Sequence, residues 1–281
     1  MSRLFVIALI TAQLLCAQAP NIAGVWKADQ QKSKMAGPPL KDYLEIIDQN
    51  GPKVTETTGV FSEHGEQRAV LTFTTDGKPA IHPYQGVPSR ATANWNGNTL
   101  SLKLETAGRP DIINKTYELS TDGQTLTVTI EAPRNGRRMT STTVLIKQPD
   151  SAADQLRKPE QTAESRFKNV KTPLKTLPAS QFIDNMHYFS WALNKDCEFC
   201  HVKGKFDSDD KKEKRTARKM IEMTASIDAD NFKGKPEVRC YTCHEFRNKP
   251  QSRPRFEGEP EKHEDEHHGQ PDRDQQRPTG K

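Results

Sequence analysis

The sequence predicts a multidomain protein in which an N-terminal all-β antiparallel meander or barrel is followed by a C-terminal, mainly α-helical module. Tight-turn dipeptides separate alternating apolar and polar runs between residues 20 and 148, which is typical of antiparallel strands. Helical spacing of apolar residues replaces this alternation between residues 177 and 250. Four of the five cysteines also lie in that second region, so the two parts differ in chemistry as well as in fold.

The first 19 residues have the features of a secretory signal peptide. Arg3 supplies a positive charge, residues 4–15 form an apolar stretch, and Ala17-Gln18-Ala19 offers a small-residue cleavage site. Pro20 would follow the cleavage point, where proline is a poor substrate residue. We therefore expect an exported, periplasmic protein, and an uncleaved N-terminus that keeps the protein at a membrane is the alternative.

Charge and composition exclude one class of partner and set further boundaries. Lys and Arg number 42 against 37 Asp and Glu, a net charge of +5 without a long basic block, which argues against nucleic acid as a partner. The hydrophobic fraction of 33% is low for 281 residues, so part of the chain lies outside any core. We expect a polar linker at residues 149–176 and a disordered charged tail at residues 251–281.

The region 20–148 contains five turn dipeptides with strand-like runs such as Thr99–Leu104 between them. The dipeptides are Asn50-Gly51, Asp76-Gly77, Asn96-Gly97, Asp122-Gly123 and Asn135-Gly136. Near its start, Gly24-Val25-Trp26 resembles the G-x-W signature of lipocalin-type barrels. The resemblance implies a calycin-like barrel with or without a ligand cavity. We favour a filled barrel with Trp26 as a core plug, because side chains usually fill small barrels.

The C-terminal region contains the motif C-x-x-C-H twice, at Cys197–His201 and at Cys240–His244. This is the attachment signature of c-type haem. Cysteines at positions i and i+3 of a helical turn point to one face, and the histidine that follows lies on the same face. The sequence therefore predicts two covalently attached haem c groups. Their thioether bonds come from Cys197, Cys200, Cys240 and Cys243, and His201 and His244 bind the two irons.

Two other uses of these cysteines fit less well. A zinc ribbon separates its two C-x-x-C pairs by about 15–20 residues, whereas Cys200 and Cys240 are much farther apart, with 39 residues between them. Disulfides are the default in an exported protein, yet residues 20–196 contain no cysteine at all.

Each motif follows a run that predicts a helix, at residues 181–193 and 214–227. These helices contain the candidates for the second axial ligand of each iron, which are Met186, His187, Met220 and Met223. Methionine often fills gaps in cores, but a methionine-bearing helix precedes both motifs here. A methionine sulfur opposite a histidine raises the haem potential and closes the sixth position of the iron.

Two stretches of this region resemble the cytochrome c subunit of photosynthetic reaction centres. Ala217–Thr224 followed by Cys240–His244 resembles one haem unit of that family, and Leu177–Ser180 leads through Met186 to Cys197 as in its first haem unit. The similarity covers about residues 170–248. It implies that a helix-borne methionine and the motif histidine hold each haem.

Carried over position by position, the resemblance assigns Met186 to the first iron and Met220 to the second. It leaves Met223 for packing and makes Tyr188 and Trp191 aromatic residues of the haem pocket or core.

Two differences from that family limit what the resemblance implies. The family's subunit carries four haems, and this chain has two attachment motifs. The stretch Asp228–Arg239 contains no histidine where the family takes a distal ligand for its bis-histidine haem. The resemblance therefore implies the haem module rather than a place in photosynthesis, and the β region is expected to dock this module or to bind something itself.

These observations predict an exported dihaem cytochrome that relays electrons between periplasmic or membrane redox partners, whose identities stay open. The alternatives are a haem redox enzyme and a haem-based sensor with a ligand- or partner-binding β domain. An enzyme needs an open sixth position, so the methionine ligands favour a carrier. Between residues 203 and 219, eight basic residues stand against four acidic ones, and they either steer an acidic partner or form a solvated face.

Overall fold

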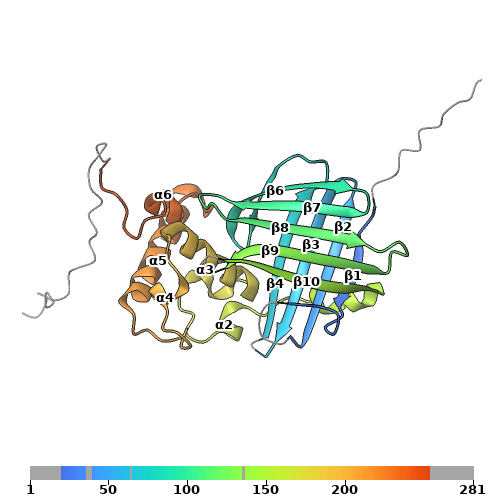
Figure 1. Cartoon of the computed structure of the whole chain (residues 1–281). Helices are drawn as coiled ribbons and strands as arrows, with labels where there is room; N and C mark the ends of the chain where they lie inside the picture. The colour runs from blue at the N-terminus through green and yellow to red at the C-terminus, as the bar shows by residue number, and fades with distance from the viewer. Residues whose placement is uncertain (1–19, 36–39, 64, 135–136, 254–281) are drawn as a thin grey trace, which may run out of the picture.

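The computed structural model describes residues 20–35, 40–63, 65–134 and 137–253, and the structural statements below concern these ranges. A β-barrel lies beside a group of helices, in chain order (Figure 1). The predicted signal peptide and the tail from residue 254 onward lie outside the described residues. No described helix is long and apolar enough to cross a membrane.

The described strands form one antiparallel sheet in the order β4-β3-β2-β1-β10-β9-β8-β7-β6-β5. Their bounds are β1 (Gly24–Ala28), β2 (Asp42–Asn50), β3 (Lys53–Ser62), β4 (Gly65–Thr74), β5 (Ala80–Tyr84), β6 (Val87–Asn96), β7 (Thr99–Thr106), β8 (Ile112–Leu119), β9 (Thr125–Arg134) and β10 (Arg137–Gln148). The first strand pairs with both β2 and β10, which joins the two ends of the meander. The sheet curls so that β4 and β5 lie next to each other, giving a nearly closed barrel.

The predicted turns connect these strands. Gly51 and Gly97 both have φ of 58°, the left-handed conformation that tight hairpin turns require and that glycine adopts without strain. The predicted turn Asn135-Gly136 lies outside the described residues. Alternation within the strands sets the two faces, because Leu100, Leu102 and Leu104 are buried and the residues between them are exposed.

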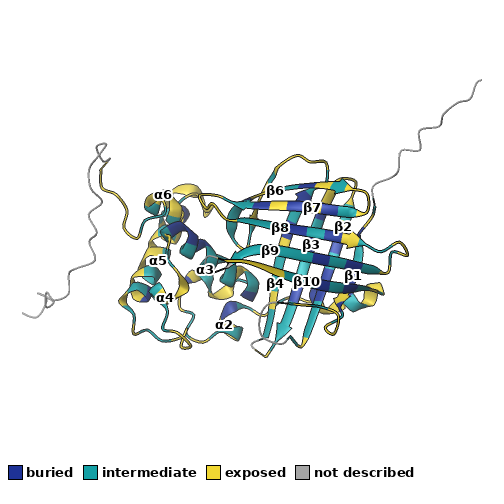
Figure 2. Cartoon of the chain, viewed as in Figure 1, coloured by how far each residue is buried: buried dark blue, intermediate teal, exposed yellow. Residues whose placement is uncertain are grey.

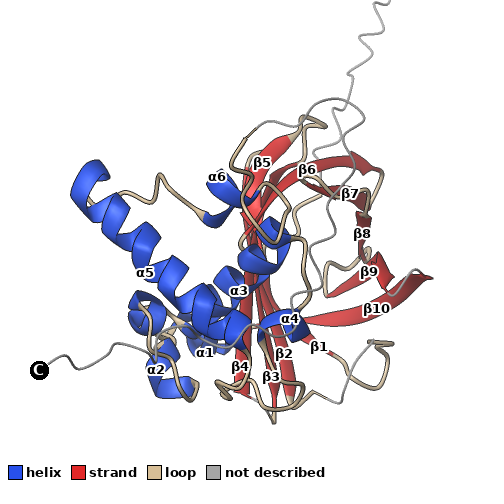
Figure 3. Cartoon of the chain, turned by 90° about the vertical axis from the view of Figure 1, so that its left-hand side faces the viewer, coloured by secondary structure: helices blue, strands red, loops and turns tan. Residues whose placement is uncertain are grey.

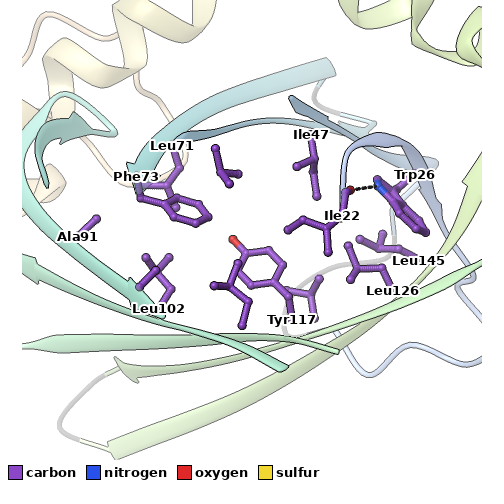
Figure 4. Close-up of a cluster of buried hydrophobic side chains, with 14 of the residues drawn as sticks. Ile22, Trp26, Ile47, Leu71, Phe73, Ala91, Leu102, Tyr117, Leu126 and Leu145 are labelled. Carbon is purple, nitrogen blue, oxygen red and sulfur yellow. Dashed lines mark hydrogen bonds between the residues drawn. The ribbon is translucent and has the colours of Figure 1, made fainter. Parts of the chain in front are cut away.

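Apolar side chains from opposite strands meet inside the barrel (Figure 4). Trp26 is fully buried there, and its indole Nε1 donates a hydrogen bond of 3.0 Å to the carbonyl oxygen of Ile22. The core-plug interpretation of Trp26 is confirmed. The same interior also buries Glu45, Glu56 and Lys115, which alternation alone did not reveal.

The segment predicted as a linker lies against the outside of the barrel instead of extending freely. Its short helices are η1 (Asp150–Ala153), α1 (Asp154–Arg157), α2 (Ala163–Arg166) and η2 (Pro173–Thr176). Leu156 packs on Gly59, where a Cβ atom would come within 2.2 Å of the leucine. The guanidinium of Arg68 donates to the carbonyl oxygens of Leu156 and Lys158 at 2.7 and 2.9 Å. Although its composition is polar, this segment is therefore held against the barrel by packing and by hydrogen bonds to its backbone.

The helical module contains α3 (Ala179–Leu193), α4 (Cys197–Cys200), α5 (Lys212–Phe232) and α6 (Cys240–His244). Both predicted helices are confirmed, with α3 beginning two residues earlier and α5 extending to Phe232. Asn194 and Lys233 end the two helices in the left-handed conformation. The helices gather on one side of the barrel, and α3 lies against β4 and β6 (Figure 3).

Close contacts join the helical module to the barrel. The indole Nε1 of Trp191 donates a 2.7 Å hydrogen bond to the carbonyl oxygen of Ala107. Gly86 has φ of 75°, and a Cβ atom there would come within 2.2 Å of the backbone oxygen of Asp184. Gly108 leaves similar room for the ring of Phe246. The helical module therefore has a defined position on the barrel.

Candidate haem centres

The first C-x-x-C-H motif forms the short helix α4. The side chain of Asp196 caps it by accepting a 3.0 Å hydrogen bond from the backbone nitrogen of Phe199. Cys197 is exposed and Cys200 is half-buried, and both thiols are free. Burial raises the pKa of the Cys200 thiol. One helical turn thus presents two unpaired sulfur atoms within reach of the surface.

The second motif forms α6, which includes His244, whereas His201 follows the end of α4 in an extended conformation. The backbone nitrogen of Arg239 donates a 3.1 Å hydrogen bond to Oγ1 of Thr242, which closes a capping box. Cys243 is exposed and Cys240 is half-buried, again with free thiols, and burial raises the pKa of the Cys240 thiol. All four cysteines predicted as haem attachment points are therefore unpaired, which does not support a disulfide framework among them.

The two motif histidines are oriented alike. Nδ1 of His201 lies 2.9 Å from the carbonyl oxygen of Phe206, and Nδ1 of His244 lies 2.9 Å from the carbonyl oxygen of Arg247. A carbonyl oxygen only accepts, so Nδ1 carries the proton in each contact. Nε2 of each ring then keeps its lone pair, as a metal-binding histidine with a fixed tautomer requires.

The loop after His201 is held by residues that sequence analysis missed. Lys214, only 9% exposed, donates 2.8 Å hydrogen bonds to the carbonyl oxygens of Phe206 and Ser208. Asp209 forms an ion pair of 2.8 Å with Arg218 and accepts a 2.8 Å hydrogen bond from Asn169. Desolvation opposes the charge of Asp209, but the hydrogen bonds from Arg218 and Asn169 lower its pKa to about 2.

This loop changes the interpretation of the basic stretch 203–219. Three of its eight basic groups, those of Lys214, Arg215 and Arg218, are engaged with the loop. The side chain of Lys211 donates to the carbonyl oxygen of Glu198. Lys205, Lys212 and Lys219 remain exposed. The basic stretch is therefore partly structural, and its exposed lysines are the groups available to a partner.

Aromatic side chains surround the second motif. Tyr188 and Trp191 are buried and pack with Cys240 and Phe246. The ring of Trp191 stacks on that of Tyr241, with centroids 4.9 Å apart. Tyr188 and Trp191 were predicted as pocket or core aromatics, and the structure places them between the second motif and the barrel.

The candidate axial ligands lie on the predicted helices. Met186 is half-buried on α3, whereas Met220 and Met223 on α5 are 40% and 45% exposed. His187 is half-buried and its Nδ1 has no hydrogen-bond partner. Helix α3 packs against α6, and α5 packs against α4. The pairing of Met186 with the first iron and of Met220 with the second stays a prediction.

The thiols and imidazoles of the two motifs are the groups that covalent attachment and iron binding of haem c require. Each motif offers two free thiols for covalent attachment and one imidazole with a free Nε2. Parts of α5 and α6 are exposed (Figure 2), and several large apolar residues near these groups are among the exposed ones. They are Phe206, Met220, Met223, Phe232 and Tyr241. Exposed apolar surface of this kind marks a site that another group covers. No group of three or more His, Cys, Asp or Glu residues suited to a bare metal ion occurs in the described ranges.

A helical module with two such motifs, joined to a β-barrel, is the arrangement expected of a cytochrome c-like protein with an added β domain. The sequence profile of the photosynthetic reaction centre cytochrome C subunit family matches residues 115–279, more than half of the chain. The chain therefore belongs to this family of haem-binding cytochromes. The match begins within β8, so it extends beyond residues 170–248, from which the resemblance was drawn.

Known structures similar to the chain are small β-barrels that cover its N-terminal part. A secretory abundant heat soluble protein from Ramazzottius varieornatus is 11% identical with a TM-score of 0.36, over 47% of this chain and 98% of that chain. A Schistosoma mansoni fatty acid binding protein is 14% identical with a TM-score of 0.35, over 47% of this chain and 99% of that chain. Zebrafish ileal bile acid-binding protein is 18% identical with a TM-score of 0.33, over 45% of this chain and 98% of that chain. No curated protein sequence gives a significant match.

Proposed function

We propose that this protein is an exported electron carrier that holds two haem c groups and passes single electrons between redox partners. The observation that supports this most directly is the matched orientation of His201 and His244. Each imidazole follows two free thiols and directs its Nδ1 proton to a backbone carbonyl. Family membership supports the same function.

The residues of each motif have separate tasks in this proposal. The thiols of Cys197 and Cys200, and those of Cys240 and Cys243, attach the two haems through thioether bonds. When bound, haem supplies an iron that alternates between the ferrous and ferric states. His201 and His244 would each supply a nitrogen ligand with a fixed tautomer, and α3 and α5 would offer methionine sulfur. A methionine in the sixth position keeps small molecules from the iron, which favours electron transfer over catalysis.

Electron transfer partners meet such a carrier through small and short-lived interfaces. The motifs lie at the surface, since Cys197 and Cys243 are exposed. Exposed lysines of the basic stretch would steer an acidic redox partner toward the first motif, with a rate that falls as salt rises. The donor and the acceptor would be periplasmic proteins or membrane complexes, as the predicted signal peptide implies.

The experiment that tests this function is the absorption spectrum of the purified protein with and without carbon monoxide, before and after reduction. We expect reversible reduction and no response to carbon monoxide, because both irons have two protein ligands. Carbon monoxide binding to the unmodified protein would contradict the carrier and favour a haem enzyme or a sensor.

Methionine variants identify the axial ligands in the same assay. Met186→Ala and Met220→Ala should each open one iron to carbon monoxide. Met223→Ala should not, and neither should Met139→Ala, which alters an exposed methionine of β10. Carbon monoxide binding in Met223→Ala but not in Met220→Ala would show that the ligand assignment on α5 is wrong.

A further inference from the structure

Lys214 occupies an unusual place for a lysine, because it is almost buried beside the loop that follows the first motif. Its residue exposure is 9%, and lysine is rarely buried unless its charge is paired. Burial lowers its pKa, with Arg218 acting in the same direction and Asp209, 3.5 Å away, acting against it. The interactions of the ammonium group on this loop therefore offset the free-energy cost of removing it from water.

The contacts of Lys214 lead directly to the first axial histidine. Its Nζ donates to the carbonyl oxygen of Phe206 at 2.8 Å, and the same oxygen accepts from Nδ1 of His201 at 2.9 Å. A second 2.8 Å hydrogen bond to the carbonyl oxygen of Ser208 fixes the ammonium group on the loop. One carbonyl oxygen is thus shared by a charged donor and by the imidazole.

We propose that Lys214 is a positioning residue that raises the reduction potential of the first haem through the carbonyl of Phe206. This inference rests on the proposed function. A strong acceptor at Nδ1 makes the imidazole a better donor to iron and stabilises the ferric state. The ammonium group draws electron density from the shared oxygen, so that oxygen accepts less strongly from His201. The positive charge itself also favours the reduced iron, which carries one positive charge fewer.

Lys214 also links the histidine loop to the helix that carries two candidate methionine ligands. It lies in the first turn of α5, the helix of Met220 and Met223. Asp209, bound to Arg218 on the same helix, fastens the loop a second time. The lysine therefore sets the position of the Phe206 carbonyl relative to α5 as well as its strength as an acceptor.

The test is a potentiometric titration of the holoprotein, followed by absorbance, in matched lysine variants. Lys214→Met should lower the potential of one of the two haems, reducing its equilibrium constant for reduction about tenfold, the effect of a hydrogen bond to a charged group. The control is Lys212→Met, which removes the same charge from an exposed position two residues away on α5. Lys214→Arg should keep a potential near that of the unmodified protein, because arginine still donates to the carbonyl.

Several results would overturn the inference. These are equal shifts in Lys214→Met and Lys212→Met, equal shifts of both haems, or unchanged potentials with both haems retained. Should Lys214→Met not fold, Lys214→Gln decides, since its amide donates without charge. If one haem of Lys214→Gln has a lower potential than the same haem of Lys214→Arg, the inference is supported. Equal potentials in these two variants contradict it. Absence of haem from the unmodified protein would instead contradict the proposed function.

Discussion

The barrel interior contains two facing glutamates that should make its stability depend on pH. Glu45 is fully buried, its Oε1 accepts from the hydroxyl of Tyr43 at 2.5 Å, and its Oε2 has no hydrogen-bond partner. Desolvation by burial, together with the negative charge of Glu56, raises the pKa of Glu45 from 4.5 to about 7. Lys115 offsets part of this effect. The carboxyl group therefore holds its proton to near-neutral pH in the folded protein.

The sign of the effect follows from proton binding. Between pH 4.5 and about 7 the folded protein keeps a proton on Glu45 that the unfolded chain has lost, so the free energy of unfolding falls as pH rises. The difference between the two pKa values corresponds to about 3 kcal/mol. Glu45→Gln keeps the shape and remains neutral, so it should remove this fall and stabilise the barrel above pH 7.

Urea unfolding followed by circular dichroism at pH 5 and pH 8 measures this effect as a difference between variants. The free energy of unfolding of Glu45→Gln minus that of the unmodified protein should grow by about 2–3 kcal/mol from pH 5 to pH 8. Glu118→Gln, on the exposed face of β8, should give no such growth. Parallel curves for Glu45→Gln and the unmodified protein would refute the assignment of the proton to Glu45.

Three further substitutions test the packing. Lys115→Met removes the ammonium partner of buried Glu56, and urea unfolding at pH 8 should show a loss of about 3–5 kcal/mol. Trp26→Ala should cost about 3–5 kcal/mol in the same assay, because it empties the plugged end of the core, and a loss below 1 kcal/mol would contradict the plug. Gly86→Ala places a Cβ atom against the backbone oxygen of Asp184, so limited proteolysis should release the helical module faster; an unchanged rate would argue against this contact.

The sequence predicted the features that depend on local periodicity. Alternation in a run such as Thr99–Leu104 predicted a strand with one buried face, and helical spacing predicted both long helices. The helical turns that carry the two cysteine pairs were also predicted, because the spacing of C-x-x-C is local; His201 nevertheless lies beyond α4 in an extended conformation. The family match covers both motifs.

Contacts between distant segments were not predictable in this way. Glu45, Glu56 and Lys115 occupy inward positions on β2, β3 and β8, and an alternating pattern places charged residues on the outside by default. Only the strand order, which brings these three strands around one interior, shows that their charges meet.

The hydrogen bond from Lys214 to the carbonyl of Phe206 was equally hidden. A backbone oxygen is present at every residue, so the sequence does not mark which one a lysine will reach. Within the basic stretch, Lys214 looked like its exposed neighbours, and its burial depends on how the loop after His201 folds back on α5.

Covalent attachment of one haem to each C-x-x-C-H motif can be measured from the intact mass of the protein made together with haem attachment machinery. The unmodified protein should be heavier by two haems. The double variants Cys197→Ala/Cys200→Ala and Cys240→Ala/Cys243→Ala should each be heavier by one. If the unmodified protein has the mass of the polypeptide alone, it carries no covalent haem. If both double variants keep the mass of two haems, the motifs are not the attachment sites. Either result would contradict covalent attachment of one haem to each motif.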